Sequence, residues 1–229
     1  MLIKGIQKTT LLDFPGRVAC TIFTGGCNFR CPFCHNASLV TEMDDSNIPT
    51  EDIFNYLKKR KGILDGVCIT GGEPLLQPDL EDFINEIRAL GLSVKLDTNG
   101  SRPEQLKALM DKGLLDYIAM DIKSSASNYS QAAGTDKYMD SVECSIDLLM
   151  SSDIPYEFRT TVVRELHTPN DILDIAKRIR GTERYFLQGF KDSGNLIEEG
   201  YSAYSTEEMQ SILNSVQKII PSASLRGID

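Results

Sequence analysis

The chain alternates between two kinds of segment, and that alternation limits the folds it can adopt. Short runs rich in β-branched and apolar residues, typical of buried strands, span 18–23, 67–70, 93–97, 117–121, 157–162 and 184–188. Amphipathic stretches, typical of helices, lie near 50–61, 78–90, 103–112, 138–151, 170–180 and 206–219. Strands that alternate with helices form parallel βαβ units. The pattern predicts an α/β fold with parallel strands and outer helices, in a sheet that is either doubly wound or curled into a barrel.

The ends of the predicted elements carry further signals. Thr50 and Ser205 each place a capping hydroxyl before acidic residues that complement the helix dipole. Gly91 and Gly113 follow two of the helices, as expected of C-terminal caps. The final segment 224–227 is a candidate for one more short strand.

Composition and charge narrow the expected partners and surroundings. The 229 residues are 41% hydrophobic and 25% charged, which suits one globular domain over 1–229. The net charge of −9 repels phosphate backbones, so nucleic acid is not an expected partner. The sequence has neither a signal-peptide core nor a run of about 20 apolar residues that could span a membrane. We therefore expect a cytoplasmic protein with no membrane partner, whose six cysteines are ligands or core residues rather than disulfides.

A cysteine-rich loop, 24–36, follows the first predicted strand. The gap between the first two strands is about twenty residues longer than one crossover helix needs, and it contains Cys27, Cys31 and Cys34 with the spacing C-x3-C-x2-C. Thiolates are the usual protein ligands of iron–sulfur clusters. Three of them would leave one iron of a 4Fe–4S cluster open to a small molecule, so this loop is the predicted metal centre.

Three other uses of these cysteines compete with a cluster. A zinc site needs four ligands, and His35 is adjacent to Cys34 and poorly placed to be the fourth. The segment 31–35 also matches the C-x-x-C-H pattern of covalent haem attachment, but haem c normally matures outside the cytoplasm, and Cys27 would have no role. A structural or redox dithiol is the third alternative.

Polar residues and glycines gather where the predicted strands end. Active sites of parallel α/β folds lie at the carboxyl ends of the strands. The residues there that can bind a ligand are Gly71, Gly72, Glu73, Asp97, Asn99, Asp121, Lys123, Arg159 and the segment 188–190. Ordinary alternatives exist, because Gly-Gly and Asn-Gly form turns, and an acid beside a base forms a salt bridge. The position of these residues at the carboxyl ends of strands favours a ligand-binding site, whereas their residue types alone are equally consistent with turns and salt bridges.

The remaining cysteines and the second histidine show no such grouping. Cys20, Cys68 and Cys144 have no C-x-x-C neighbour and are expected to be buried small apolar residues. His167 is expected in a loop that leads into a helix, with a catalytic role as the alternative.

The cysteine loop resembles the signature of the radical S-adenosylmethionine (SAM) superfamily, C-x3-C-x-aromatic-C, with Phe33 as the aromatic residue. The resemblance implies a partial (β/α)6 barrel of the TIM type, with a catalytic 4Fe–4S cluster on Cys27, Cys31 and Cys34. It also implies that the open iron binds the amino and carboxylate groups of SAM. The G-G-E-P motif that contains Glu73 resembles the superfamily's second motif, which binds the methionyl amine.

Two further segments resemble motifs of a narrower group, the glycyl-radical-enzyme activases. They are D-T-N-G at 97–100 and M-D-x-K at 120–123. The SAM contacts implied for this chain are Phe33, Gly71, Gly72, Glu73, Asp97, Asn99, Asp121 and Lys123, with Arg159 as a carboxylate partner. The candidates implied for a monovalent cation near the SAM carboxylate are Asp97, Thr98, Met120 and Asp121.

Nearly the whole chain resembles the activating proteins of anaerobic ribonucleoside-triphosphate reductases. The most specific parts are D-F-P-G at 13–16 and T-G-G-C-N-F-R-C-P-F-C-H-N at 24–36. The implied reaction cleaves SAM to a 5′-deoxyadenosyl radical, which abstracts hydrogen from a backbone glycine of a partner glycyl radical enzyme, the reductase or a related lyase. A low-potential electron donor such as flavodoxin or ferredoxin is the second implied partner. A radical SAM enzyme that acts directly on a small molecule or peptide, and a zinc or redox module without catalysis, stay open as alternatives.

Overall fold

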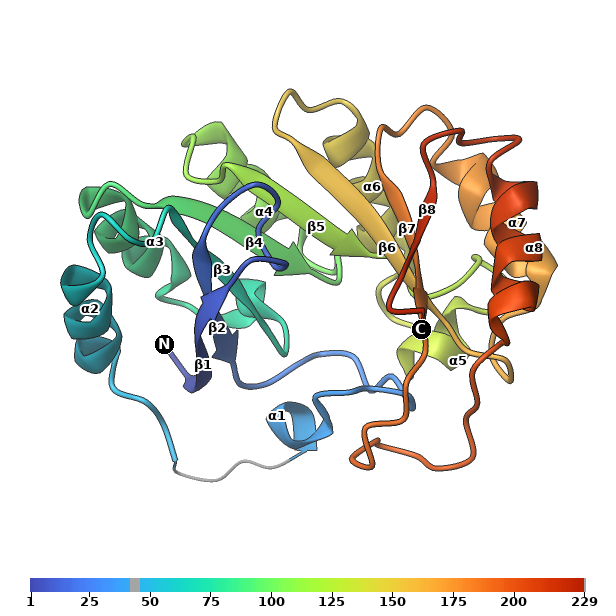
Figure 1. Cartoon of the computed structure of the whole chain (residues 1–229), viewed down its shortest axis with the longest axis horizontal. Coiled ribbons are helices and arrows are strands. Elements are labelled where there is room, and N and C mark those ends of the chain that lie inside the picture. The colour runs from blue at the N-terminus through green and yellow to red at the C-terminus, as the bar shows by residue number, and fades with distance from the viewer. Residues whose placement is uncertain (42–45, 229) are drawn as a thin grey trace.

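The computed structural model describes residues 1–41 and 46–228, which contain one eight-stranded sheet (Figure 1). The strands follow one another in the sheet in the order in which they occur in the chain. They are β1 (Ile3–Thr10), β2 (Ala19–Thr24), β3 (Gly66–Gly71), β4 (Ser93–Thr98), β5 (Tyr117–Asp121), β6 (Tyr156–Val162), β7 (Tyr185–Gly189) and β8 (Ser224–Arg226). Strands β2 to β8 are parallel, and β1 is antiparallel to β2. Because β1 and β8 are edges, the described sheet is a partial barrel that stays open.

Helices cover the outer face of the curved sheet (Figure 1). They are α2 (Thr50–Lys59), α3 (Leu80–Ala89), α4 (Pro103–Asp111), α6 (Met139–Met150), α7 (Pro169–Arg178) and α8 (Thr206–Val216). The shorter α1 (Ala37–Thr41), α5 (Tyr129–Ala133) and the 3-10 turn η1 (Pro74–Leu76) lie in the segments that follow β2, β5 and β3. Their apolar faces and the outward-facing strand residues form one continuous core. Strand residues that alternate with this core point into the barrel. The predicted parallel fold with outer helices is confirmed, and the sheet curls rather than being doubly wound.

Most predicted elements match the structure, and the differences lie at the edges. The antiparallel strand β1 and the short helices α1 and α5 were not predicted, whereas β8 forms where a last short strand was considered. Ser205 caps α8 through a capping box, and Gly91 and Gly113 have φ of 82° and 64°, as expected of C-terminal caps. Thr50 does not cap α2: it is the first helical residue, and Pro49 occupies the N-cap position without a side-chain hydrogen bond. No helix in the described part of the chain is long and apolar enough to cross a membrane.

The prediction of three buried cysteines is correct for two of them. Cys20 and Cys68 are buried in β2 and β3, but Cys144 is exposed on α6. The buried apolar stripe of α6 follows helical spacing through Val142, Ile146 and Leu149, and Cys144 lies off that stripe.

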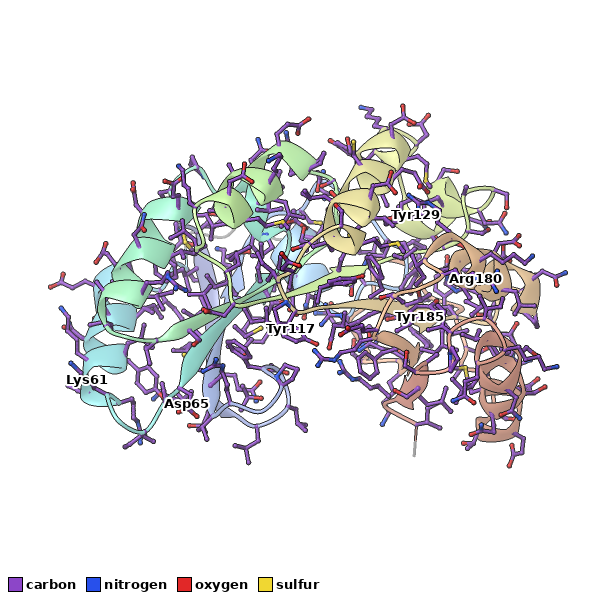
Figure 2. The ribbon with its side chains drawn as sticks, turned by 90° about the horizontal axis from the view of Figure 1, so that it is seen from above. Lys61, Asp65, Tyr117, Tyr129, Arg180 and Tyr185 are labelled. Atoms are coloured by element: carbon purple, nitrogen blue, oxygen red, sulfur yellow. The ribbon has the colours of Figure 1, made fainter. Side chains whose placement is uncertain are left out.

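Polar and aromatic side chains fill the amino end of the barrel. The loop between β1 and β2 packs Phe14 against Tyr117, with ring centroids 6.2 Å apart; Tyr117 lies near the middle of the view in Figure 2. Tyr117 donates a hydrogen bond to the carboxylate of Glu157 at 2.8 Å. Arg226 of β8 donates two more to the same buried carboxylate, at 2.7 and 3.1 Å. These contacts tie the last strand to β6, two strands away.

Candidate active site

A cavity lies at the carboxyl ends of the parallel strands, where the sequence predicts the site. The cysteine loop contributes Cys27, Cys31, Phe33 and Cys34 to its lining. The strands and the turns that follow them contribute Gly71, Gly72, Asp97, Asn99, Asp121, Lys123, Arg159 and Gln188. Every residue predicted to hold the cluster or SAM lines the cavity except Glu73, whereas the cation candidate Met120 and positions 189 and 190 of the segment 188–190 do not line it.

Backbone contacts hold the cysteine loop over the strand ends. The amide of Gly26 donates to the carbonyl of Leu39 at 2.8 Å, and that of Arg30 donates to Ala133 at 2.9 Å. Gly134 ends α5 with φ of 65°, and a Cβ there would lie 2.1 Å from the carbonyl oxygen of Arg30. The two unpredicted helices, α1 and α5, therefore fix the loop that carries the cysteines.

The three thiols differ in burial. Cys31 is buried, and Cys27 and Cys34 are partly buried. Burial raises the pKa of Cys27 to about 11 and that of Cys31 to about 12, so both thiols are protonated at neutral pH in the metal-free protein. Metal ligands must be thiolates, so loading this site with metal releases protons.

The donors are not arranged as in a closed single-ion site. Within residues 1–41 and 46–228, no three His, Cys, Asp or Glu side chains are placed to hold one metal ion. The exposed ring of His35 lines the same cavity and packs against Phe190, with centroids 5.6 Å apart. The three thiols number one fewer than the ligands of a closed zinc site, and they suit a cluster with an open iron.

The glycine pair after β3 joins this strand to the cysteine loop. Gly72 donates to the carbonyl of Thr24, and the next residue, Glu73, donates to that of Gly26, both at 2.8 Å. A Cβ on Gly72 would lie 1.9 Å from the Gly26 oxygen, and Gly71 has φ of 117°. The two backbone segments approach this closely because neither glycine carries a side chain.

Glu73 lies beneath the cavity rather than in its wall. The side chain is fully buried, and one carboxylate oxygen accepts hydrogen bonds from the amide of Leu75 (3.1 Å) and the hydroxyl of Thr98 (2.9 Å). The other oxygen accepts one from the amide of Asn99 (2.7 Å). Glu73 therefore ties the turn after β3 to the end of β4, and its contact with the methionyl amine stays a prediction.

This environment makes Glu73 a source of pH-dependent stability. Burial raises its pKa from 4.5 to about 7, so its contribution to folding is complete below pH 4.5 and is lost as the pH rises through about 7. The contribution amounts to about 3 kcal/mol. We therefore compare the unfolding free energies of the metal-free wild type and Glu73→Gln. The wild-type value minus the variant value should fall by up to about 3 kcal/mol as the pH rises from 4.5 to above about 7. Urea unfolding at a series of pH values measures this difference. If the unfolding free energies of the wild type and the variant change in parallel with pH, the pKa of Glu73 is not raised.

Five charged side chains form one chain of ion pairs, and four of them line the cavity wall. Lys95 pairs with one oxygen of Asp97, whose other oxygen accepts from Arg159 Nη1 at 3.0 Å. Arg159 Nε also donates to Asp121 Oδ1 at 2.8 Å, and the second oxygen of Asp121 pairs with Lys123 at 3.0 Å. Lys95 is buried behind the wall, so the four members that line the cavity are two cations and two anions.

The ion pairs keep both aspartates ionised. Burial alone would raise their pKa values, but Arg159 and Lys95 hold the pKa of Asp97 below its usual range, and Arg159 and Lys123 do the same for Asp121. Asp121 in turn raises the pKa of Lys123 against the effect of burial. The charges persist at neutral pH, so the wall offers both carboxylates and the cations Lys123 and Arg159 to the polar groups of a ligand.

Asn99 links the end of β4 to the cysteine loop through partners that were not predicted. Its Nδ2 donates to Asn28 Oδ1 at 3.1 Å and lies 3.8 Å from the sulfur of Cys27. Asn28 in turn donates to the hydroxyl of Ser101 at 2.8 Å. In the sequence, the only signal for Asn28 and Ser101 is that they adjoin Cys27 and the D-T-N-G motif.

His167 supports the site from outside the cavity. Its buried ring accepts a hydrogen bond from the amide of Val163 at Nδ1 (3.0 Å), so Nε2 carries the proton and donates to the carbonyl of Lys123 at 2.6 Å. Burial lowers the pKa of His167, which keeps the ring neutral. The ring also packs edge-on against Phe33, with centroids 6.2 Å apart. His167 precedes a helix, as expected, and it positions Lys123 rather than lining the cavity.

The family follows from comparison with known sequences. The profile of the radical SAM superfamily matches residues 21–179, a range that includes the cysteine loop and all five ion-paired residues. The chain belongs to the radical SAM superfamily. Membership implies a 4Fe–4S cluster and SAM as cofactors.

Several relatives have names that describe an activity. The chain is 32% identical over 212 residues to a Methanocaldococcus jannaschii protein named as a glycyl-radical enzyme activating enzyme, across 86% of this chain and 83% of that protein. It is also 32% identical over 133 residues to the pyruvate formate-lyase-activating enzyme of Listeria monocytogenes, across 53% of this chain and 52% of that enzyme. Streptococcus suis SuiB bound to S-adenosylmethionine has a TM-score of 0.71 over 88% of this chain at 14% identity, which shows the fold alone. The chain spans about half the length of the last two proteins, 52% and 48%.

The cavity residues fit the cofactors that the family implies. Three thiolates can hold three irons and leave one open, the glycine pair leaves room for a ligand beside the backbone, and the cations Lys123 and Arg159 in the wall can pair with a carboxylate.

Proposed function

We propose that this chain is a glycyl-radical-enzyme activating enzyme, which abstracts hydrogen from a backbone glycine of a partner enzyme. The observation that carries the proposal is the 32% identity to the Methanocaldococcus jannaschii protein of that name over most of both chains. The partner is the anaerobic ribonucleoside-triphosphate reductase or a related glycyl radical lyase. The electron donor is a low-potential protein such as flavodoxin or ferredoxin, in the cytoplasm.

Each part of the cavity has a role in this proposal. Cys27, Cys31 and Cys34 hold the cluster. SAM is held by Phe33, Gly71, Gly72, Glu73, Asp97, Asn99, Asp121, Lys123 and Arg159. When bound, the reduced cluster and SAM supply a 5′-deoxyadenosyl radical, and the protein supplies binding, orientation and shielding. The neutral ring of His167 fixes the Lys123 backbone, and the buried Phe33 shields the loop from water.

The open barrel supports a protein substrate. Among the described strands, β1 and β8 are edges and do not close the sheet. A glycine inside a partner enzyme must reach the radical as part of a polypeptide segment, which needs more access than a small molecule does. An open side admits such a segment.

The test is to activate the partner in vitro. The reconstituted chain, a strong reductant and SAM are mixed anaerobically with the reductase from the same organism, and electron paramagnetic resonance records the product. A glycyl-radical signal on the reductase, absent when the recipient glycine is replaced by alanine, is the expected result. SAM cleavage that proceeds without a radical on any glycyl radical enzyme of that organism would reject the activase and favour direct action on a small molecule or peptide.

A further inference from the structure

The guanidinium of Arg159 lies between two carboxylates that reach it from neighbouring strands. Its Nη1 donates to Asp97 Oδ2 at 3.0 Å, and its Nε donates to Asp121 Oδ1 at 2.8 Å. Lys95 and Lys123 pair with the two remaining oxygens. Every carboxylate oxygen of Asp97 and Asp121 therefore already faces a protein cation.

These two aspartates are also the acidic members of the monovalent-cation site implied by the resemblance to activases. The other two candidates do not supply free oxygens from their side chains. The hydroxyl of Thr98 donates to Glu73 at 2.9 Å and accepts from the amide of Gly100 at 3.1 Å. Met120 carries a thioether, which packs under Gly100, where a Cβ would lie 2.1 Å from its Cε. The side chains present do not fit a bound cation.

Charge leads to the same result. A metal cation binds where anionic and carbonyl oxygens outnumber the positive charges around them. Here three fixed cations surround two anions, so an added cation would be repelled by Arg159, Lys95 and Lys123 at close range. Arg159 is only 14% exposed and is held at both of its bonded nitrogens, so it does not leave this position without breaking two ion pairs.

We propose that Arg159 takes the place of a monovalent cation between Asp97 and Asp121, so that this chain builds its SAM site without a metal cation beside the cluster. The guanidinium supplies the positive charge and bridges the two strand ends. The inference concerns SAM binding and does not depend on which partner receives the radical.

The first experiment compares cations on the metal-free wild type. Thermal unfolding is recorded in potassium chloride, sodium chloride and N-methylglucamine chloride at one ionic strength, and titration calorimetry follows potassium binding. The three melting temperatures should coincide, and no saturable heat should appear. A saturable stabilisation by potassium or sodium over N-methylglucamine would overturn the proposal.

Variants test whether the guanidinium stands where a cation would bind. Arg159→Met leaves Asp97 Oδ2 and Asp121 Oδ1 facing an empty position, and it should acquire a saturable stabilisation by sodium or potassium. The matched control is Arg178→Met, because Arg178 also bridges two acids, Glu143 and Asp147, but does so on the outer helices. That control should show no difference between cations.

SAM affinity gives a second measurement. On reconstituted protein, the dissociation constant of the wild type should be the same in potassium and N-methylglucamine chloride, whereas that of Arg159→Met should be weaker and should recover in potassium. A folded Arg159→Met that binds SAM as tightly as the wild type in either salt would also overturn the proposal. If Arg159→Met does not fold, the wild-type measurements and Arg159→Lys, expected to be insensitive to the cation, decide the question.

Discussion

The Cys31→Ala variant should contain less iron than the wild type after anaerobic reconstitution and should form no detectable 5′-deoxyadenosine from SAM. Cys31 is one of three thiols that line the cavity, and two thiolates do not hold a 4Fe–4S cluster that needs three protein ligands. Backbone hydrogen bonds hold the loop, so the metal-free variant should lose only about 1 kcal/mol of unfolding free energy. Iron analysis, visible absorption and chromatography of the SAM products measure the outcome.

Cys144→Ala provides the matched control, because it makes the same exchange on the exposed side of α6. Its iron content and SAM cleavage should equal those of the wild type. Wild-type SAM cleavage by Cys31→Ala would contradict the assignment of Cys31 as a cluster ligand. Equal losses in the two variants would contradict a specific role for the loop.

The Gly72→Ala variant should be destabilised by about 3 kcal/mol or more and should load the cluster poorly. The new Cβ would lie 1.9 Å from the carbonyl oxygen of Gly26, so the glycine turn and the cysteine loop must separate. Separation breaks the hydrogen bond from Glu73 to Gly26 and moves the neighbouring Cys27. Urea unfolding of the metal-free protein measures the first effect, and iron per chain after reconstitution measures the second.

Gly5→Ala separates this clash from a general intolerance of alanine at glycine positions. A Cβ on Gly5 would meet the ring of Phe23 at 3.5 Å, an ordinary contact. This control should change the unfolding free energy by less than about 1 kcal/mol and leave iron content unchanged. A Gly72→Ala variant as stable as Gly5→Ala would show that the turn and the loop do not pack as described.

The parallel part of the fold could be predicted because strands β2 to β5 are mostly buried on both faces and the crossover helices are amphipathic. The residues 18–23 and 117–121 therefore stand out as short apolar runs between helical patterns. The edge strand β1 lacks that signal, since much of Ile3–Thr10 is partly buried or exposed and the stretch carries two lysines. The short helices α1 and α5 were missed because five residues are too few for an apolar stripe to appear.

The sequence also predicted where the candidate site lies in the fold, but it did not predict which of its residues pair with one another. Asp97 and Asp121 were expected near each other because the carboxyl ends of parallel strands share one edge, and Arg159, in the middle of β6, was expected as a carboxylate partner. The pairing of Arg159 with Asp97 joins residues 62 positions apart and depends on strand register. Lys95 was missed because a lysine within a strand normally indicates an exposed face, yet here the interior of the barrel is charged. Glu73 was expected to face a ligand, but its hydrogen bonds to neighbouring turns became visible only in three dimensions.

The sequential order of the strands has a consequence for folding during synthesis. Each strand pairs with the strand made just before it, so the sheet can grow along one edge without waiting for distant segments. One side chain that does wait for a distant segment is Glu157, whose carboxylate is buried in the barrel and pairs with Arg226, made 69 residues later. Until the ribosome releases β8, a nascent chain must leave this carboxylate hydrated, because a buried charge without its partner is costly. The interior of the barrel is therefore expected to become dry only when the eighth strand is added.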